Sequence, residues 1–96
     1  MKVLITDGNE RAALAVTRAL GREEVEVIVG AESQRSLAGS SRYCRQSITY
    51  PSPYQEPERF IATLMEAVRT HRVDALIPLS DIAMHVLGPE KAQFEK

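Results

Sequence analysis

Four short apolar runs, separated by polar turns and helix-forming segments, constrain the fold of this 96-residue chain more than any other feature. The runs are VLI at 3–5, VEVIV at 25–29, SITY at 47–50 and DALIP at 74–78. They read mainly as continuous apolar stretches, as is typical of strands that are buried on both faces of a parallel sheet. We therefore expect strands at 2–6, 25–29, 47–50 and 74–78.

The segments between these runs have helical periodicity. Residues 10–20 are rich in alanine, with Asp7 or Asn9 suited to the N-cap and Gly21 to the C-cap. Residues 57–72 predict the clearest helix, because their apolar residues fall on one stripe (Phe60, Ile61, Leu64, Met65, Val68). A short helix is expected at about 81–87, and residues 89–96 look like the start of another.

This order of elements predicts the fold class. Strands that alternate with helices require right-handed crossovers, and these place helices on both faces of a parallel sheet. Only 31–42, rich in Ser, Gly and Arg, is predicted as a long loop. We expect a three-layer, Rossmann-like α/β fold of about four parallel strands that occupies residues 1–88.

Composition narrows the range of partners. The 12 basic and 13 acidic residues nearly cancel, so neither a nucleic acid nor another polyanion is expected. The first apolar run is too short for a signal peptide or a membrane span. The single cysteine, Cys44, can form neither an internal disulfide nor, alone, a metal site, which favours a cytoplasmic protein.

Candidate binding residues lie in the loops at the carboxyl ends of the predicted strands, where open parallel sheets bind ligands. Asp7-Gly8-Asn9 could offer backbone amides to an anion or form a plain tight turn; one glycine does not make a dinucleotide fingerprint. Arg35 could hold a carboxylate or a phosphate, or be a solvated surface charge. Ser80 or Asp81 could cap the next helix, and Asp81 could bind a substrate ammonium group.

No catalytic or metal-binding residues are predicted. His71 and His85 have no orienting partner in the sequence, and Cys44 has no activating histidine beside it. Phosphate-binding, nucleophile-elbow and paired metal-ligand motifs are missing from the 96 residues.

Several segments together resemble the N-terminal, pre-ATP-grasp domain of ATP-grasp enzymes. They are the opening VLITDGNERAALAVTRALGREEVEVIVG, the stretch SLAGSSRYCRQSITYPSP, and PERFIATLMEAVRTHRVDALIPLSD. The last two are similar to a carbamoyl-phosphate-synthase-like subgroup. SRYC, YPSP and DALIPLSD carry the resemblance most specifically.

The resemblance implies the N-terminal substrate-side domain of an ATP-dependent carboxylate–amine ligase, inactive alone. It places substrate-binding residues after the first strand (Asp7, Gly8, Asn9) and after the fourth (Ser80, Asp81), with Glu32, Ser33 and Arg35 in the long loop. ATP and Mg²⁺ would bind to further ATP-grasp domains, which are the implied partners besides a small carboxylate or amine substrate. Residues 89–96 would lead into that ATP-binding region.

Two alternatives remain open at this stage. One is a free-standing Rossmann-like module that binds a small ligand or regulates another protein. The other is self-association through an exposed hydrophobic face near the carboxyl end, expected at Ile82, Val86, Leu87 and Phe94.

Overall fold

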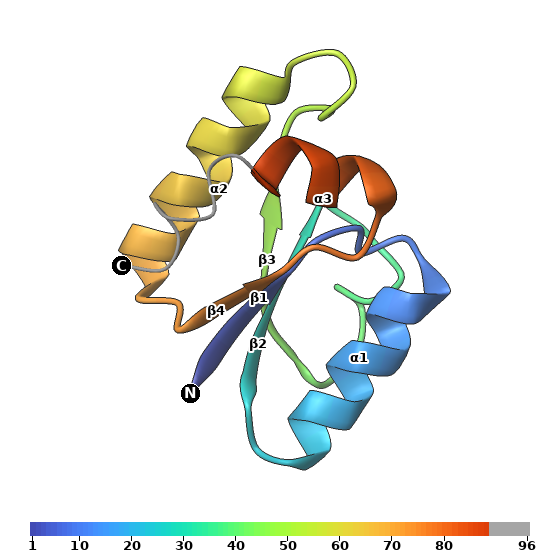
Figure 1. Cartoon of the computed structure of the whole chain (residues 1–96). Helices are drawn as coiled ribbons and strands as arrows, with labels where there is room; N and C mark the ends of the chain where they lie inside the picture. The colour runs from blue at the N-terminus through green and yellow to red at the C-terminus, as the bar shows by residue number, and fades with distance from the viewer. Residues whose placement is uncertain (89–96) are drawn as a thin grey trace.

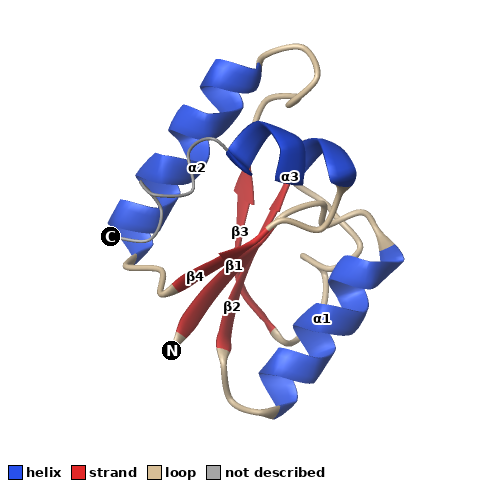
Figure 2. Ribbon diagram, viewed as in Figure 1, coloured by secondary structure: helices blue, strands red, loops and turns tan. Residues whose placement is uncertain are grey.

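The computed structural model describes residues 1–88, and within this range four parallel strands lie between helices (Figures 1 and 2). The strands are β1 (Lys2–Ile5), β2 (Glu26–Ala31), β3 (Cys44–Thr49) and β4 (Ala75–Ile77). The helices are α1 (Arg11–Arg22), α2 (Pro57–His71) and α3 (Asp81–Leu87). The predicted three-layer, Rossmann-like α/β class is confirmed.

The order of the strands across the sheet is β3-β2-β1-β4. Leu4 of β1 is in register with Ile28 of β2 on one side and with Leu76 of β4 on the other. The chain thus first moves from β1 outward to β3 and then crosses back to β4 on the opposite side. This reversal creates a switch point between the carboxyl ends of β1 and β4, where sheets of this kind bind ligands.

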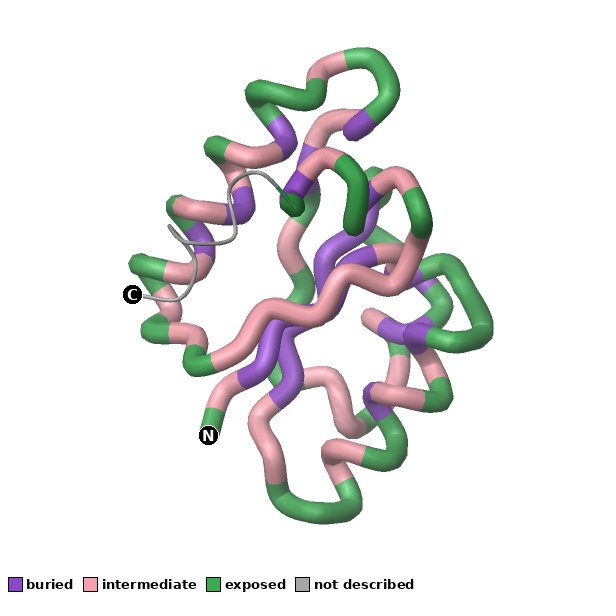
Figure 3. Tube along the Cα trace, in the orientation of Figure 1, coloured by how far each residue is buried: buried purple, intermediate pink, exposed green. Residues whose placement is uncertain are grey.

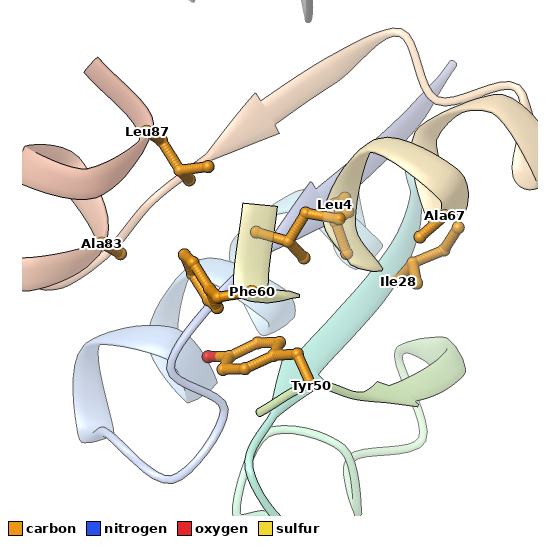
Figure 4. Close-up of a cluster of buried hydrophobic side chains, with 8 residues drawn as sticks. Leu4, Ile28, Tyr50, Phe60, Ala67, Ala83 and Leu87 are labelled. Carbon is orange, nitrogen blue, oxygen red and sulfur yellow. The ribbon is translucent and has the colours of Figure 1, made fainter. Parts of the chain in front are cut away.

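The two faces of the sheet pack against different elements. Val3, Ile5, Val27 and Val29 lie on the face that is covered by α1 and by Ala38 of the long loop. Leu4 and Ile28 lie on the opposite face, which is covered by α2 and α3 (Figure 4). Figure 3 shows that β1 and β2, in the middle of the sheet, are mostly buried. Alternate residues of β1 and β2 therefore enter two separate cores, which explains why both strands are apolar throughout.

The helices on the two faces contact the sheet through side chains of different size. On the α2 side, Phe60 and Leu64 are fully buried, and the half-buried Ile61 and Val68 pack against the same cluster. These four residues of the predicted stripe are core, whereas Met65 is half-buried outside the cluster. On the α1 side the contact is closer, because Ala13 is the fully buried apolar residue of that helix. A small residue at this position lets the helix axis approach the sheet.

Two predicted helix boundaries are wrong. The N-cap of α1 is Glu10 rather than Asp7 or Asn9, and no side chain caps the helix there. Gly21 lies inside the helix, whose C-cap is Glu23. Its role is close packing: a Cβ on Gly21 would lie 2.5 Å from the Cβ of Tyr43.

Strand β3 begins earlier than the apolar run SITY suggests. It starts at Cys44, and Arg45, Gln46 and Ser47 within it are exposed. An edge strand with one partner can carry polar residues in this way, and these residues hide it from a reading based on hydrophobicity.

The hydrophobic face expected near the carboxyl end needs one correction. Leu87 is buried against Phe60 and its neighbours, so it is not part of an exposed face. Ile82 and Val86 are half-buried and Met84 is exposed. Phe94 and the helix predicted at 89–96 lie outside the described residues. Within residues 1–88, no helix is both long and apolar enough to cross a membrane.

Candidate functional site

The turn after β1 is held by three backbone amides. Asp7 has a left-handed backbone (φ 59°), and its N–H donates to the Tyr50 hydroxyl at 2.9 Å. The N–H of Gly8 donates to the Gly30 carbonyl at 3.0 Å, and that of Glu10 to the Asp7 carbonyl at 2.9 Å. These three amides therefore have acceptors within the chain and are not free to bind an anion.

Gly8 brings the long loop onto this turn. Its carbonyl accepts the N–H of Ala38 at 2.8 Å, and a Cβ at Gly8 would lie 2.6 Å from the Oγ of Ser36. The loop is braced at the same point, because the Ser36 Oγ accepts the N–H of Gly39 at 2.9 Å. The segments after β1 and β2 are therefore one packed unit.

Thr6 links this unit to the end of β4. Its side chain is fully buried, and its Oγ1 accepts the N–H of Leu79 at 3.0 Å. The same hydroxyl donates to the carboxylate of Asp7. The predicted segments after the first and fourth strands thus meet through one buried oxygen atom.

Tyr50 supports the turn after β1 through its hydroxyl group. Its ring is buried and packs edge-on against Phe60, with centroids 4.7 Å apart, and Figure 4 shows its hydroxyl directed toward the turn after β1. Burial raises the pKa of Tyr50 to about 12; the bond from the Asp7 amide opposes this rise, and the charges of Asp7 and Glu32 add to it. The hydroxyl therefore stays neutral through the physiological pH range.

The predicted binding residues fall into two groups. Asp7 is half-buried and Gly8 buried within the braced turn, while Asn9 is exposed beside them. Ser80 caps α3, because its Oγ accepts the Ala83 N–H at 3.2 Å, and Asp81 is exposed in the first turn of that helix.

The long-loop residues form the second group. Glu32, Ser33 and Arg35 are all exposed. The Ser33 Oγ donates to the Arg35 carbonyl at 3.0 Å, and the Arg35 guanidinium makes no hydrogen bond or ion pair with any residue in 1–88. The structure thus joins the turn after β1 to the β4–α3 connection, but it does not tie these three side chains to either.

Thr6 and Tyr50 were missed by the sequence reasoning. Both fall at the ends of predicted strands (2–6 and 47–50) and were not named as site residues, although their hydroxyls bond to amides at this edge. Their position at the last residues of apolar runs was the available signal, because polar atoms placed there reach the ligand-binding edge of a parallel sheet.

The chemistry available at this edge is that of binding. The exposed or half-buried carboxylates of Asp7, Glu32 and Asp81 can accept hydrogen bonds, and Arg35 adds a cation at the rim. Among residues 1–88, no three His, Cys, Asp or Glu side chains are grouped so as to hold a metal ion.

Comparison with known proteins identifies the fold class first. No family model and no curated protein sequence matches the chain. Solved structures do match it, and they show that the chain has a Rossmann-like α/β fold. One such structure is glycinamide-RNase-transformylase T from Mycobacterium tuberculosis, with a TM-score of 0.68 and 18% sequence identity. The alignment covers 96% of this chain and 26% of the transformylase, so the chain spans about a quarter of that protein's length.

Proposed function

We propose that this chain is the substrate-side domain of an ATP-dependent carboxylate–amine ligase of the ATP-grasp type. The observation that carries the proposal is the fold: almost the whole chain superposes on the N-terminal domain of an ATP-grasp enzyme. The segments on which the sequence resemblance rests are a second support: SRYC and YPSP flank β3, and DALIPLSD spans β4 and the first residue of α3. These motifs are also the basis for proposing the carbamoyl-phosphate-synthase-like subgroup. The single cysteine, Cys44, is the basis for proposing a cytoplasmic location.

In this proposal the substrate binds at the switch point between β1 and β4. Asp7, Gly8 and Asn9 lie on one side of it, and Ser80 and Asp81 lie on the other. Glu32, Ser33 and Arg35 would form an outer rim. Three of these eight residues are carboxylates and one is a cation, a balance that favours the amine substrate over the carboxylate.

ATP and Mg²⁺ are assigned to domains other than this one. The described residues do not fit either group, since they contain no phosphate-binding glycine motif and no cluster of metal ligands. We therefore derive no chemical step on this chain. Its role is to hold one substrate, and the ATP-grasp domains would activate the carboxylate as an acyl phosphate.

Titration calorimetry on the 96-residue chain tests this assignment. MgATP, NAD and the proteinogenic amino acids serve as probes. We expect no nucleotide complex, and we expect any amino acid that binds to lose affinity in Asp7→Asn and Asp81→Asn. Glu66→Gln is the matched control, because Glu66 is an exposed carboxylate on α2, away from the switch point.

A tight complex with MgATP or NAD would overturn the proposal, and it would favour a free-standing nucleotide-binding module. Equal affinity loss in Glu66→Gln would show that general charge, rather than the proposed edge, determines binding.

A further inference from the structure

The hydroxyl of Thr6 has two partners that belong to different parts of the proposed site. It accepts the N–H of Leu79, which is 73 positions away in sequence, at 3.0 Å. It donates its single proton to the Asp7 carboxylate. Thr6 is fully buried, which shields its hydroxyl from water, whereas the Asp7 carboxylate is half-buried.

Asp7 is fixed from its other side as well. Its amide is held by the buried Tyr50 hydroxyl at 2.9 Å. Its φ of 59° is uncommon for a residue with a Cβ, so the surrounding bonds must stabilise this backbone conformation. The backbone that carries this carboxylate is therefore held by bonds to neighbouring strands of the sheet. A change in the charge of the carboxylate acts first on its hydrogen-bond donor, the Thr6 hydroxyl.

Leu79 connects this arrangement to α3. The next residue, Ser80, caps that helix by accepting the Ala83 N–H at 3.2 Å. A hydroxyl that donates to a carboxylate becomes a stronger acceptor, because charge-assisted bonds polarise their neighbours. The negative charge on Asp7 thus strengthens the bond from Leu79 to Thr6, although Asp7 itself makes no hydrogen bond to Leu79.

We propose that Thr6 is a positioning residue that couples the Asp7 turn to the start of α3. Neutralisation of the Asp7 carboxylate, as by a bound ammonium group, loosens the Leu79 amide and with it the segment that presents Ser80 and Asp81. The use of this coupling in substrate binding rests on the proposed function. The coupling itself is a property of this chain alone, so its test needs no ligand.

Amide hydrogen exchange measured by NMR on the 96-residue chain provides the test. In Asp7→Asn, which removes the charge and keeps the shape, exchange at Leu79 is expected to rise about threefold. In Thr6→Val, which removes the hydroxyl, it is expected to rise about tenfold, and Thr6→Ser should restore it to within about twofold of the native rate.

Two controls separate coupling from general loosening. The amide of Val73, which donates to the Val68 carbonyl at 3.0 Å beyond the opposite end of β4, should keep its native rate in Asp7→Asn. Thr17→Val removes a buried hydroxyl that bonds within α1, to the Ala13 carbonyl, and should leave Leu79 unchanged.

Unchanged exchange at Leu79 in Asp7→Asn would overturn the proposal, whatever Thr6→Val does, because Thr6 would then be a simple structural link. An equal rise at Leu79 and Val73 would overturn it too, since the effect would be global. The proposed function would survive both results, because it depends on ligand binding and not on this relay. If Thr6→Val does not fold, Asp7→Asn and Thr6→Ser still decide the question.

Discussion

Replacing Gly8 with alanine tests the packing of the candidate site most sharply. A Cβ at this position would lie 2.6 Å from the Ser36 Oγ and 2.7 Å from a Cγ of Val29. Favourable contacts between non-bonded carbon atoms lie at about 3.5–4.0 Å, so the neighbours would have to move by roughly 1 Å on two sides. Gly8 does not have a positive φ, and the effect is therefore steric rather than conformational.

The magnitude follows from what can move. Val29 is 1% exposed in β2, and Ser36 holds the Gly39 amide, so neither side chain yields without loss. Overpacking costs about 1–3 kcal/mol, and loss of the Ser36–Gly39 bond adds about 1 kcal/mol. Alanine also restricts the unfolded chain more than glycine does, and this effect stabilises the variant by about 0.4–1 kcal/mol. The net loss is about 1–3.6 kcal/mol, which corresponds to a fall of about 4–29 °C in Tm for a domain of this size.

Thermal unfolding followed by circular dichroism measures this loss. Asn9→Ala is the matched control, because it places alanine one residue further along the same turn at an exposed site, and its effect should stay within about 0.5 kcal/mol. In a double-mutant cycle, Val29→Ala should relieve part of the Gly8→Ala cost. A Tm for Gly8→Ala equal to that of Asn9→Ala would refute the close approach of the long loop to the turn after β1.

Three further variants test the core, the start of α3 and the buried hydroxyl. Leu64→Ala, at a fully buried position of α2, should lower the free energy of unfolding by about 2–5 kcal/mol in urea titrations; under 1 kcal/mol would contradict the α2-side core. Ser80→Ala should cost about 1 kcal/mol through loss of the α3 cap, and an unchanged urea midpoint would argue against that cap. Burial raises the pKa of Tyr50 to about 12, so the neutral phenol contributes to the stability of the folded state. This contribution is fully present below about pH 10 and is lost as the pH rises through about 12. Tyr50→Phe should therefore lose less stability than the native chain between pH 10 and 12, and parallel pH curves would disprove this role of burial.

Helices and strands whose apolar residues are buried in a regular pattern were predictable from the sequence. Phe60, Leu64 and the apolar residues of β1 and β2 are buried in the two cores, as the helical stripe and the apolar runs had predicted. Boundaries that depend on a single tertiary contact were not. Gly21 resembles a C-cap locally, and only its close contact with Tyr43 explains a glycine inside the helix.

The candidate site was likewise predictable only in part. The topology of a parallel sheet brings the ends of β1 and β4 to one edge, so the proximity of Asp7 to Ser80 follows from the order of elements. The bonds that join them were beyond sequence reasoning. Thr6 reaches Leu79 across 73 positions and Asp7 reaches Tyr50 across 43, and no local pattern marks a buried hydroxyl that will bond to a distant amide.

In the proposed function, this domain holds a small substrate at the switch point while ATP binds elsewhere. NMR titration of the ¹⁵N-labelled chain tests it most directly, with MgATP and the amino acids as separate probes and the amides of Gly8, Asn9 and Asp81 as reporters. We expect shifts caused by an amino acid to concentrate at these amides, and we expect MgATP to leave them in place. Saturable shifts on addition of MgATP, or amino acid shifts confined to the opposite end of the sheet, would contradict it.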